Sequence, residues 1–247
     1  FAPQFEDESL EKKKLYKLAF PKKKYDEKKL GYLFSDILWY AEQHLIQSKF
    51  QEQFVLQQFY LLQEYVGLNL DKHYRNGLSL ARNSQKKSKL RDADFFYNEF
   101  LLEAVENVYF DNQRSHRFDK SLQLAVDNLD LYFLTLKLKY SCEILNRRNV
   151  VASDYEIRLL DEILNYIESH SFEQAPAIQV YYSILRTLRE PENEKHFEKL
   201  KKYLAQHTDK FSHKEARDMY AYAQNYCIKQ INSGNMKFLS DLFQLYK

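Results

Sequence analysis

The chain has 247 residues, with only four glycines, four prolines and a formal net charge of +2. Average proteins contain roughly 7% Gly and 5% Pro, so the residues that build tight turns and phosphate-binding loops are scarce here. The near balance of charge argues against a protein that binds polyanions over its whole surface. Leu, Lys, Glu and Gln are abundant and favour helices. The composition therefore predicts an all-α protein.

Two cysteines, Cys142 and Cys227, stand alone in the sequence and form no CxxC pair. They predict neither a disulfide framework nor a structural zinc site, and the simplest expectation is a reducing, cytoplasmic compartment. No uninterrupted apolar run approaches the roughly 20 residues that span a bilayer. Because the sequence begins at Phe1 rather than Met, we expect it to be a fragment of a longer chain.

Residues that cap or break helices divide the chain into about eleven predicted helices. One segment is ambiguous, because residues 129–140 alternate apolar and polar side chains as a half-buried strand does. We expect a helix there too, since the apolar residues also fit a 3.6-residue period and no second strand is predicted nearby to share ladder hydrogen bonds. The predicted helices span residues 7–20, 26–47, 49–67, 69–88, 92–112, 118–146, 153–170, 175–189, 192–207, 212–232 and 235–247.

Several predicted helix ends rest on specific signals. Ser153 and Ser212 are each followed three residues later by Glu, which is the spacing of a capping box. Pro176 suits the first turn of a helix, where its missing N–H is not needed. Gly67 and Gly234 fit the C-terminal ends of helices, where glycine readily adopts the left-handed conformation.

The second half of the chain repeats an apolar pattern. Three predicted helices carry quartets with spacings of three, three and one, and the quartets are offset by 37 and 42 residues. Two intervening helices match each other at an offset of 39 residues. Such repeats predict helical hairpins that must stack, because each hairpin alone has too small a core. The quartets are Leu160, Ile163, Tyr166 and Ile167; Phe197, Leu200, Tyr203 and Leu204; and Leu239, Leu242, Leu245 and Tyr246. The matching trios are Ala177, Tyr181 and Ile184, and Ala216, Tyr220 and Ala223.

The trios place an aromatic residue four positions after a small one, which resembles the second helix of tetratricopeptide repeats. The resemblance covers residues 153–247, although the Gly and Trp typical of the first helix of that repeat are missing. It implies antiparallel helical hairpins stacked as a right-handed, TPR-like α-solenoid. We expect one such domain over residues 1–247, most regular in 153–247. The alternative is an irregular helical bundle, in which amphipathic helices produce similar spacings.

The last predicted helix, residues 235–247, carries apolar residues but no stop signal and has no later partner. Its apolar side needs a cover, either from more of the same chain or from another molecule. We favour a longer parent chain. We also expect this end to self-associate when nothing else covers it.

Standard motifs for catalysis and metal binding are missing from the sequence. No two histidines have HxxxH spacing, and no GxxxxGK[ST], GxGxxG or GxSxG occurs. Glu192 and His196, like Asp209 and His213, are four residues apart, a spacing more typical of surface pairs than of metal sites. We therefore expect no catalytic residue, no cofactor and no metal ligand. A site assembled from distant helices leaves no such signal and stays open.

Residues 72–91, KHYRNGLSLARNSQKKSKLR, contain seven cations and no acid. Outside this segment the chain has 30 cations and 35 acids. On a helical wheel, five of the cations share one stripe beside a neutral stripe. The charged stripe predicts a site for phosphate or for an acidic peptide. Its members are Lys72, Arg75, Arg82, Lys86 and Lys89, and the neutral stripe contains Tyr74, Leu78, Ala81 and Gln85.

The next predicted helix, residues 92–112, offers a structural explanation for the same stripe. If this acid-rich helix packs antiparallel to 72–91, its Glu99, Glu103 and Glu106 can neutralise the cations. Our leading hypothesis is therefore a non-catalytic helical-repeat scaffold that binds a protein or peptide partner. The first alternative is nucleic-acid or phosphate-ligand binding through 72–91, and the second is an enzyme whose site is dispersed over several helices.

Overall fold

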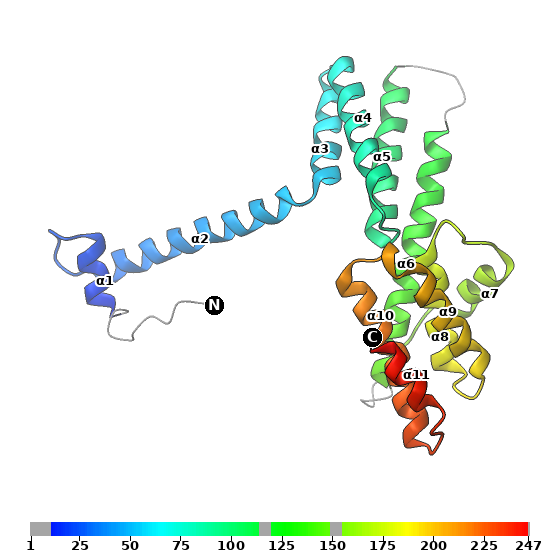
Figure 1. The fold of residues 1–247 in the computed structure, drawn as a ribbon. Helices are drawn as coiled ribbons and strands as arrows, with labels where there is room; N and C mark the ends of the chain where they lie inside the picture. Colours follow the sequence, from blue (N-terminus) through cyan, green and yellow to red (C-terminus); the bar gives the residue numbers. More distant parts are fainter. Residues whose placement is uncertain (1–10, 114–119, 149–154, 247) are drawn as a thin grey trace. The chain divides into compact units, whose positions relative to one another are not determined.

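The computed structural model describes residues 11–113, 120–148 and 155–246 (Figure 1). Within these ranges it contains eleven α-helices, one short 3-10 helix at Thr208–Lys210 and no β-strand. The all-α prediction and the predicted number of helices are confirmed, and the ambiguous segment 129–140 is helical. The helices are α1 (Lys12–Ala19), α2 (Glu27–Gln51), α3 (Phe54–Gly67), α4 (Asp71–Lys87), α5 (Ala93–Asn112), α6 (Ser121–Arg148), α7 (Leu160–Ser169), α8 (Pro176–Arg189), α9 (Glu194–His207), α10 (His213–Asn232) and α11 (Phe238–Leu245).

The predicted start of α7 is wrong. The helix begins at Leu160, and residues 155–159 are not helical. Ser153, the proposed cap, lies outside the described residues. Leu159, directly before the helix, has a φ of 61°, a left-handed conformation that interrupts any helix arriving from residue 155.

Side chains cap the N-termini of α2, α5 and α10. The Ser212 hydroxyl accepts a hydrogen bond from the Glu215 N–H at 3.2 Å, so the predicted cap of α10 is confirmed. Asp26 and Asp92 cap α2 and α5 in the same way. Pro176 occupies the first position of α8, as predicted. These caps satisfy N–H groups that have no partner inside the helix.

The two predicted glycine stops have different outcomes. Gly234 follows α10 with a φ of 91°, as a left-handed helix end requires. Gly67, in contrast, is the last residue of α3 and is not left-handed. Asn69 takes that conformation instead, with a φ of 55°, and the Leu70 N–H closes the turn on the Tyr65 carbonyl at 2.8 Å. Asparagine is the residue other than glycine that most readily does so.

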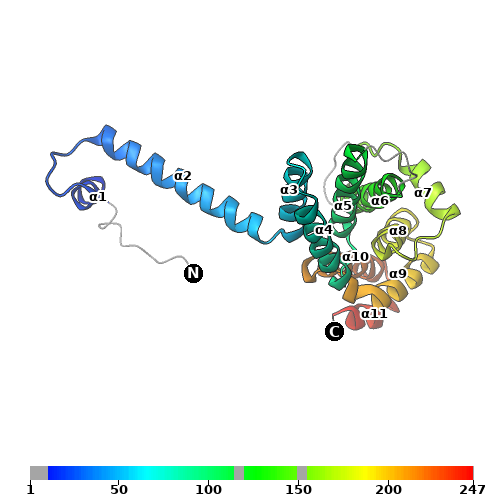
Figure 2. The same ribbon diagram turned by 90° about the horizontal axis from the view of Figure 1, so that it is seen from above.

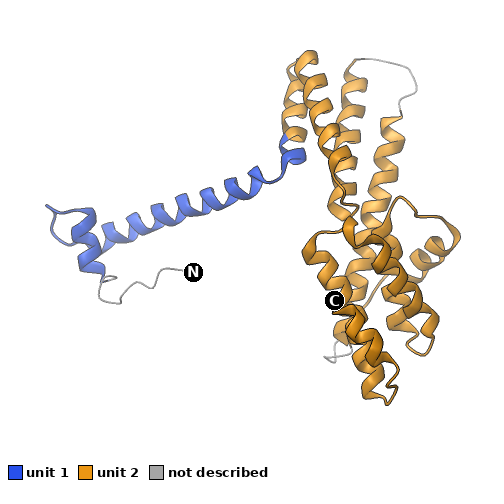
Figure 3. Ribbon diagram, in the orientation of Figure 1, with its two compact units in different colours: residues 1–57 blue, residues 58–247 orange. Residues whose placement is uncertain are grey.

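The structure divides the chain into two compact units, residues 1–57 and residues 58–247, where the sequence pattern led us to expect one repeat domain (Figure 3). In the first unit, α1 and α2 form a hairpin, and within residues 11–51 the buried side chains are Tyr16 and Leu30. The Tyr16 ring stands edge-on to Tyr25 at 5.4 Å. Such a small core explains why this unit is separate. No helix in the described ranges is both long and apolar enough to cross a bilayer.

In the second unit, α8 is the central helix. It packs against α6, α9 and α10, while α5 packs on α6 and α11 on α10 (Figure 2). One continuous core runs through α6 to α11, and Tyr181 of α8 and Phe197 of α9 are among its largest fully buried side chains.

The repeat pattern describes the packing of the second unit in part. In the quartets that begin at Leu160 and Phe197, the first, second and fourth residues are buried. In the third quartet Leu242 and Leu245 pack against the core, but Leu239 is 40% exposed and Phe238, which is 2% exposed, is buried in its place. Phe238 fills a gap beside the rings of Phe197 and Tyr226, at centroid distances of 5.6 and 5.5 Å. The right-handed solenoid itself stays a prediction.

Candidate functional site

The basic helix α4 buries one face of its surface. Tyr74, Ala81 and Gln85 of the predicted neutral stripe are buried, whereas Leu78 is only half-buried. Gly77 is buried in its place. A Cβ at Gly77 would lie 3.3 Å from a leucine side chain of α3, so the glycine permits the close approach of that helix.

The central cation of the predicted stripe, Arg82, is paired with acids of α5. Its Nη1 lies 2.8 Å from Glu103 Oε1, and its Nη2 bonds Glu106. Although burial lowers it, these bonds and charges raise the pKa of Arg82 above its ordinary value. Glu99 accepts a hydrogen bond from Gln85 at 3.1 Å. The structural explanation is therefore correct for Arg82, which is not available to a ligand.

The other four predicted cations face solvent, but Lys89 is not on the helical stripe, because α4 ends at Lys87 and Ser88 is extended. Lys72, Lys86 and Lys89 are exposed, and no acid within the described ranges lies within 4.0 Å of their ammonium groups. Arg75 is exposed as well, and a hydrogen bond to the Tyr109 side chain raises the pKa of its guanidinium. The structure thus separates the predicted site into one neutralised arginine and four cations on an open surface, rather than one enclosed site.

A denser basic segment was missed by the sequence interpretation. Residues 12–29 hold nine lysines against two acids, Asp26 and Glu27. The ammonium groups of Lys23 and Lys29 both stand over the Phe20 ring, at 5.7 and 4.7 Å from its centroid. The proximity of Lys23 lowers the pKa of Lys29. A charge count in short windows would have found this segment, whose lysines are Lys12, Lys13, Lys14, Lys17, Lys22, Lys23, Lys24, Lys28 and Lys29.

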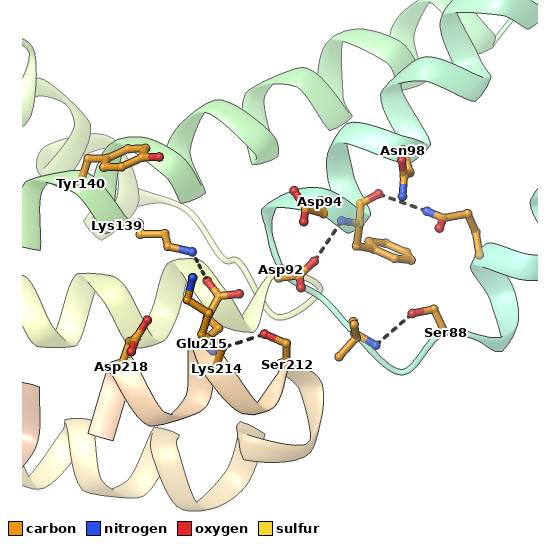
Figure 4. A pocket seen from close by; sticks show the side chains of 13 residues that line it. Ser88, Asp92, Asp94, Asn98, Lys139, Tyr140, Ser212, Lys214, Glu215 and Asp218 are labelled. Atoms are coloured by element: carbon orange, nitrogen blue, oxygen red, sulfur yellow. Dashed lines mark hydrogen bonds and ion pairs between the residues drawn. The ribbon is translucent and has the colours of Figure 1, made fainter. Parts of the chain in front are cut away.

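Three cavities follow one another along the facing helices α6 and α10. The first, of about 520 Å³, lies among the N-terminal ends of α5 and α10 and the middle of α6 (Figure 4). The second, of about 390 Å³, shares Lys139, Tyr140 and Asp218 with it. The third, of about 480 Å³, shares Asn146 and Asn225 with the second. Neighbouring cavities share lining residues, and we name the row of three cavities the α6–α10 groove.

A buried carboxylate joins the helices at the first end of the groove. Glu215 of α10 accepts hydrogen bonds from Lys139 Nζ of α6 at 3.0 Å and from the Tyr181 hydroxyl of α8 at 2.7 Å (Figure 4 draws the bond to Lys139). Burial and the neighbouring Glu215 charge raise the pKa of Tyr181. Because one carboxylate contacts three helices, it fixes the spacing of α6 and α10 over the central helix.

A second buried carboxylate, Asp92, lies across the same cavity. Its Oδ1 caps α5 by accepting from the Phe95 N–H at 3.0 Å (Figure 4). Burial raises the pKa of Asp92, and the negative charges of Glu215 and Asp94 raise it further. Both buried carboxylates of the groove are therefore engaged in bonds that hold helices in place.

The middle of the groove presents paired charges and free amides. Glu143 accepts from Arg147 Nε at 2.6 Å and from the Tyr222 hydroxyl at 2.9 Å, so these groups neutralise one another. The carboxamides of Asn146 and Asn225 line two of the three cavities and form no hydrogen bond with any described residue. Each carboxamide can donate and accept at the same time. The groove therefore offers free polar groups without an unpaired charge at its centre.

A separate cavity of about 490 Å³ lies among α7, α8 and α9. Its wall includes Gln179 and the Tyr182 hydroxyl, which donates to Glu168 at 2.6 Å. Lys199 stands over the Tyr182 and Tyr203 rings at 5.9 and 5.6 Å. This cavity shares no lining residue with the α6–α10 groove, which makes it a useful internal control.

The two acid–histidine pairs expected from sequence spacing do not form. His196 Nε2 lies 2.9 Å from Glu190 rather than Glu192. Asp209 pairs with the neighbouring Lys210 and not with His213. The spacing argument required one continuous helix, but Glu192 precedes α9 and Asp209 precedes α10. In the described part of the chain, no group of three or more His, Cys, Asp and Glu side chains is placed to hold a metal ion.

A scan against protein-family models, a search of curated proteins and a search of solved structures each found no match.

Proposed function

We propose that residues 58–247 form a non-catalytic scaffold that binds an extended segment of another protein in the α6–α10 groove. The observation that carries the proposal is the series of three cavities that share walls along two facing helices. Helix α10 has 20 residues, so it is about 30 Å long. An extended chain rises roughly 3.3 Å per residue, so the groove has room for about nine residues.

Asn146 and Asn225 supply contacts suited to a peptide backbone. A peptide group has one N–H donor and one carbonyl acceptor, and a single carboxamide can satisfy both. Since neither side chain is bonded within the described structure, binding a peptide breaks no existing protein hydrogen bond. These contacts do not depend on the sequence of the bound segment, so selectivity would come from the cavities at the two ends.

The chemistry of the groove favours binding over a reaction. Its buried carboxylates, Asp92 and Glu215, hold a helix cap and a three-helix junction. A general acid or base needs a free proton-transfer position next to the substrate. The polyanion alternative is weakened by Arg82, whose charge is used by two glutamates. We therefore place the scaffold hypothesis ahead of both alternatives.

A selection from random displayed peptides tests the proposal. Peptides enriched on the wild-type chain should bind the double variant Asn146→Ala and Asn225→Ala about 30-fold more weakly. That factor corresponds to about 2 kcal/mol for the hydrogen bonds of two carboxamides. The control is Gln179→Ala, which truncates an amide in the separate cavity and should leave affinity unchanged. Failure to enrich any peptide, or equal losses in the two variants, would overturn the proposal.

A further inference from the structure

The long helix α2 leaves an unusual amount of apolar surface uncovered. It has 25 residues, of which only Leu30 is buried. Nine large apolar side chains are each at least 38% exposed. At roughly 150–250 Å² for a whole aromatic side chain, their exposed area is on the order of 1,000 Å², above the largest patch of a typical monomer. The nine are Tyr32, Phe34, Ile37, Leu38, Trp39, Tyr40, Leu45, Ile46 and Phe50.

Eight of these side chains lie on two opposite sides of α2, and Tyr40 flanks one of the two sides. At 100° per residue, one stripe occupies a sector of roughly 100°, the width typical of a helix that packs in a bundle. We name it the aliphatic stripe, and its exposed members are Phe34, Ile37, Leu38, Ala41 and Leu45. A second, aromatic stripe lies on the opposite side at a spacing of seven residues and contains Tyr32, Trp39 and Ile46.

We propose that the aliphatic stripe packs antiparallel against the same stripe of a second copy of this chain. A two-fold axis between Ile37 and Leu38 places the largest side chain of the stripe, Phe34, opposite its smallest, Ala41. Facing large and small residues let two helices approach closely without voids. A two-fold axis brings the same surface of both copies together, so each contact between two different residues occurs twice. The facing pairs are Phe34 with Ala41 and Ile37 with Leu38, each formed twice.

Charge selects the antiparallel arrangement. The nine lysines of residues 12–29 lie in α1, in the connecting segment and in the first turn of α2. In a parallel pair the two lysine-rich segments would lie side by side and repel each other. In an antiparallel pair they are separated by most of the length of α2, about 37 Å for 25 residues. This distance exceeds the roughly 8 Å screening length at physiological salt. Each segment then lies beside the C-terminal end of the other helix, whose dipole is negative.

The area available is sufficient for a specific but modest interface. Covering the aliphatic stripe and the flanking Tyr40 in both copies buries on the order of 1,000 Å², the lower limit for a biological interface. We therefore expect a reversible dimer in the micromolar range. The aromatic stripe stays outside this interface, which provides a matched control on the same helix.

Sedimentation velocity of the full 247-residue chain from 1 to 100 µM tests the inference. The wild type should dimerise, and Ile37→Asp should raise the dissociation constant at least 30-fold. Ile46→Asp, which introduces the same charge in the aromatic stripe, should dimerise as the wild type does. Circular dichroism of both variants checks that α2 remains helical. A wild type that is monomeric at 100 µM, or equal losses in the two variants, would overturn the inference.

The C-terminal helix provides a competing route to self-association. Leu239 and Phe243 of α11 are exposed, as are Met236 before the helix and Tyr246 after it. If Phe243→Asp abolishes the dimer and Ile37→Asp does not, the interface lies on α11 and the inference for α2 is wrong.

Cross-linking tests the direction of the pair. The proposed axis places Glu27 opposite Ser48, while the native Cys142 and Cys227 are buried. A mixture of Glu27→Cys and Ser48→Cys chains should be joined by a short bis-maleimide, and Glu27→Cys chains alone should not. Efficient linking of Glu27→Cys chains to one another would indicate a parallel pair and contradict the proposed register.

Discussion

Removal of the Arg82 guanidinium should destabilise the 58–247 unit. The substitution Arg82→Met introduces an unbranched apolar side chain of similar length and deletes both ion pairs to α5. Glu103, whose side chain is 4% exposed, would then be a buried carboxylate without a cationic partner. Such a group is costly because neither water nor a counter-charge replaces the lost contact.

The size of the effect follows from the exposure of the three groups. Removing one partner of a fully buried ion pair typically costs about 3–5 kcal/mol of stability. The side chains of Arg82 and Glu106 retain 31% and 22% exposure, so solvent screens part of the loss. We expect a decrease of about 2–3 kcal/mol in the free energy of unfolding, equivalent to roughly 5–10 °C in Tm for a unit of this size.

Urea unfolding monitored by circular dichroism measures this loss, and a double-mutant cycle isolates the pair. Glu103→Gln and the double variant complete the cycle, with an expected coupling of about 2 kcal/mol. Lys86→Met on the exposed side of α4 is the control and should cost no more than about 0.5 kcal/mol. If Arg82→Met matches this control, or if the two single losses simply add, the ion pair does not stabilise the packing of α4 on α5.

Three further predictions follow from buried groups and glycines. Burial raises the pKa of Asp92, so the folded state binds this proton more tightly than the unfolded state does. Ionisation of Asp92 therefore costs stability as the pH rises through the raised pKa. The variant Asp92→Asn keeps the helix cap, so it should stabilise the protein at pH 7 and lose this gain near pH 4, whereas Asp92→Ala should cost about 1 kcal/mol. If thermal melts show that the effect of Asp92→Asn does not depend on pH, this explanation is refuted. Burial raises the pKa of Cys227 to about 11 and that of Cys142 well above its ordinary value, so neither thiol should react with a colorimetric disulfide reagent at pH 8 until the chain unfolds; rapid labelling of the native protein would contradict this. In Gly31→Ala nothing lies within 4 Å of the new Cβ, so this variant should stabilise α2 by up to about 1 kcal/mol. Gly77→Ala should gain less stability, because its Cβ meets a neighbouring side chain at 3.3 Å. Equal gains in the free energy of unfolding, measured by denaturation, would show that this contact is easily relieved.

Helices were predictable from sequence because their signals are local. Caps such as Ser212 and Pro176 act within one turn, and the apolar period identified the segment 129–140 as a helix without knowledge of its neighbours. The end of α3 at residue 67 agrees with the prediction, although Asn69 rather than Gly67 takes the left-handed conformation. The predicted start of α7 failed, because the left-handed Leu159 lies directly before the helix.

Tertiary placement was less accessible to sequence reasoning. The wheel placed five cations on one helical stripe, but α4 ends at Lys87, so Lys89 lies outside the helix. The wheel also could not show that Arg82 reaches the acids of α5. The burial of Phe238 in place of Leu239 depends on the space between two other rings, so periodicity could not reveal it. The α6–α10 groove is formed by helices about 80 residues apart in sequence, and no local motif marks it.

Photo-cross-linking of a selected peptide provides the most direct measurement of binding in the groove. A peptide that carries a central benzoylphenylalanine would be irradiated with the wild-type chain, and the linked residues identified by mass spectrometry. We expect cross-links within residues 139–147 of α6 and 218–232 of α10. Cross-links that fall instead on α7, α9 or residues 12–51 would contradict the proposal that the α6–α10 groove is the binding site.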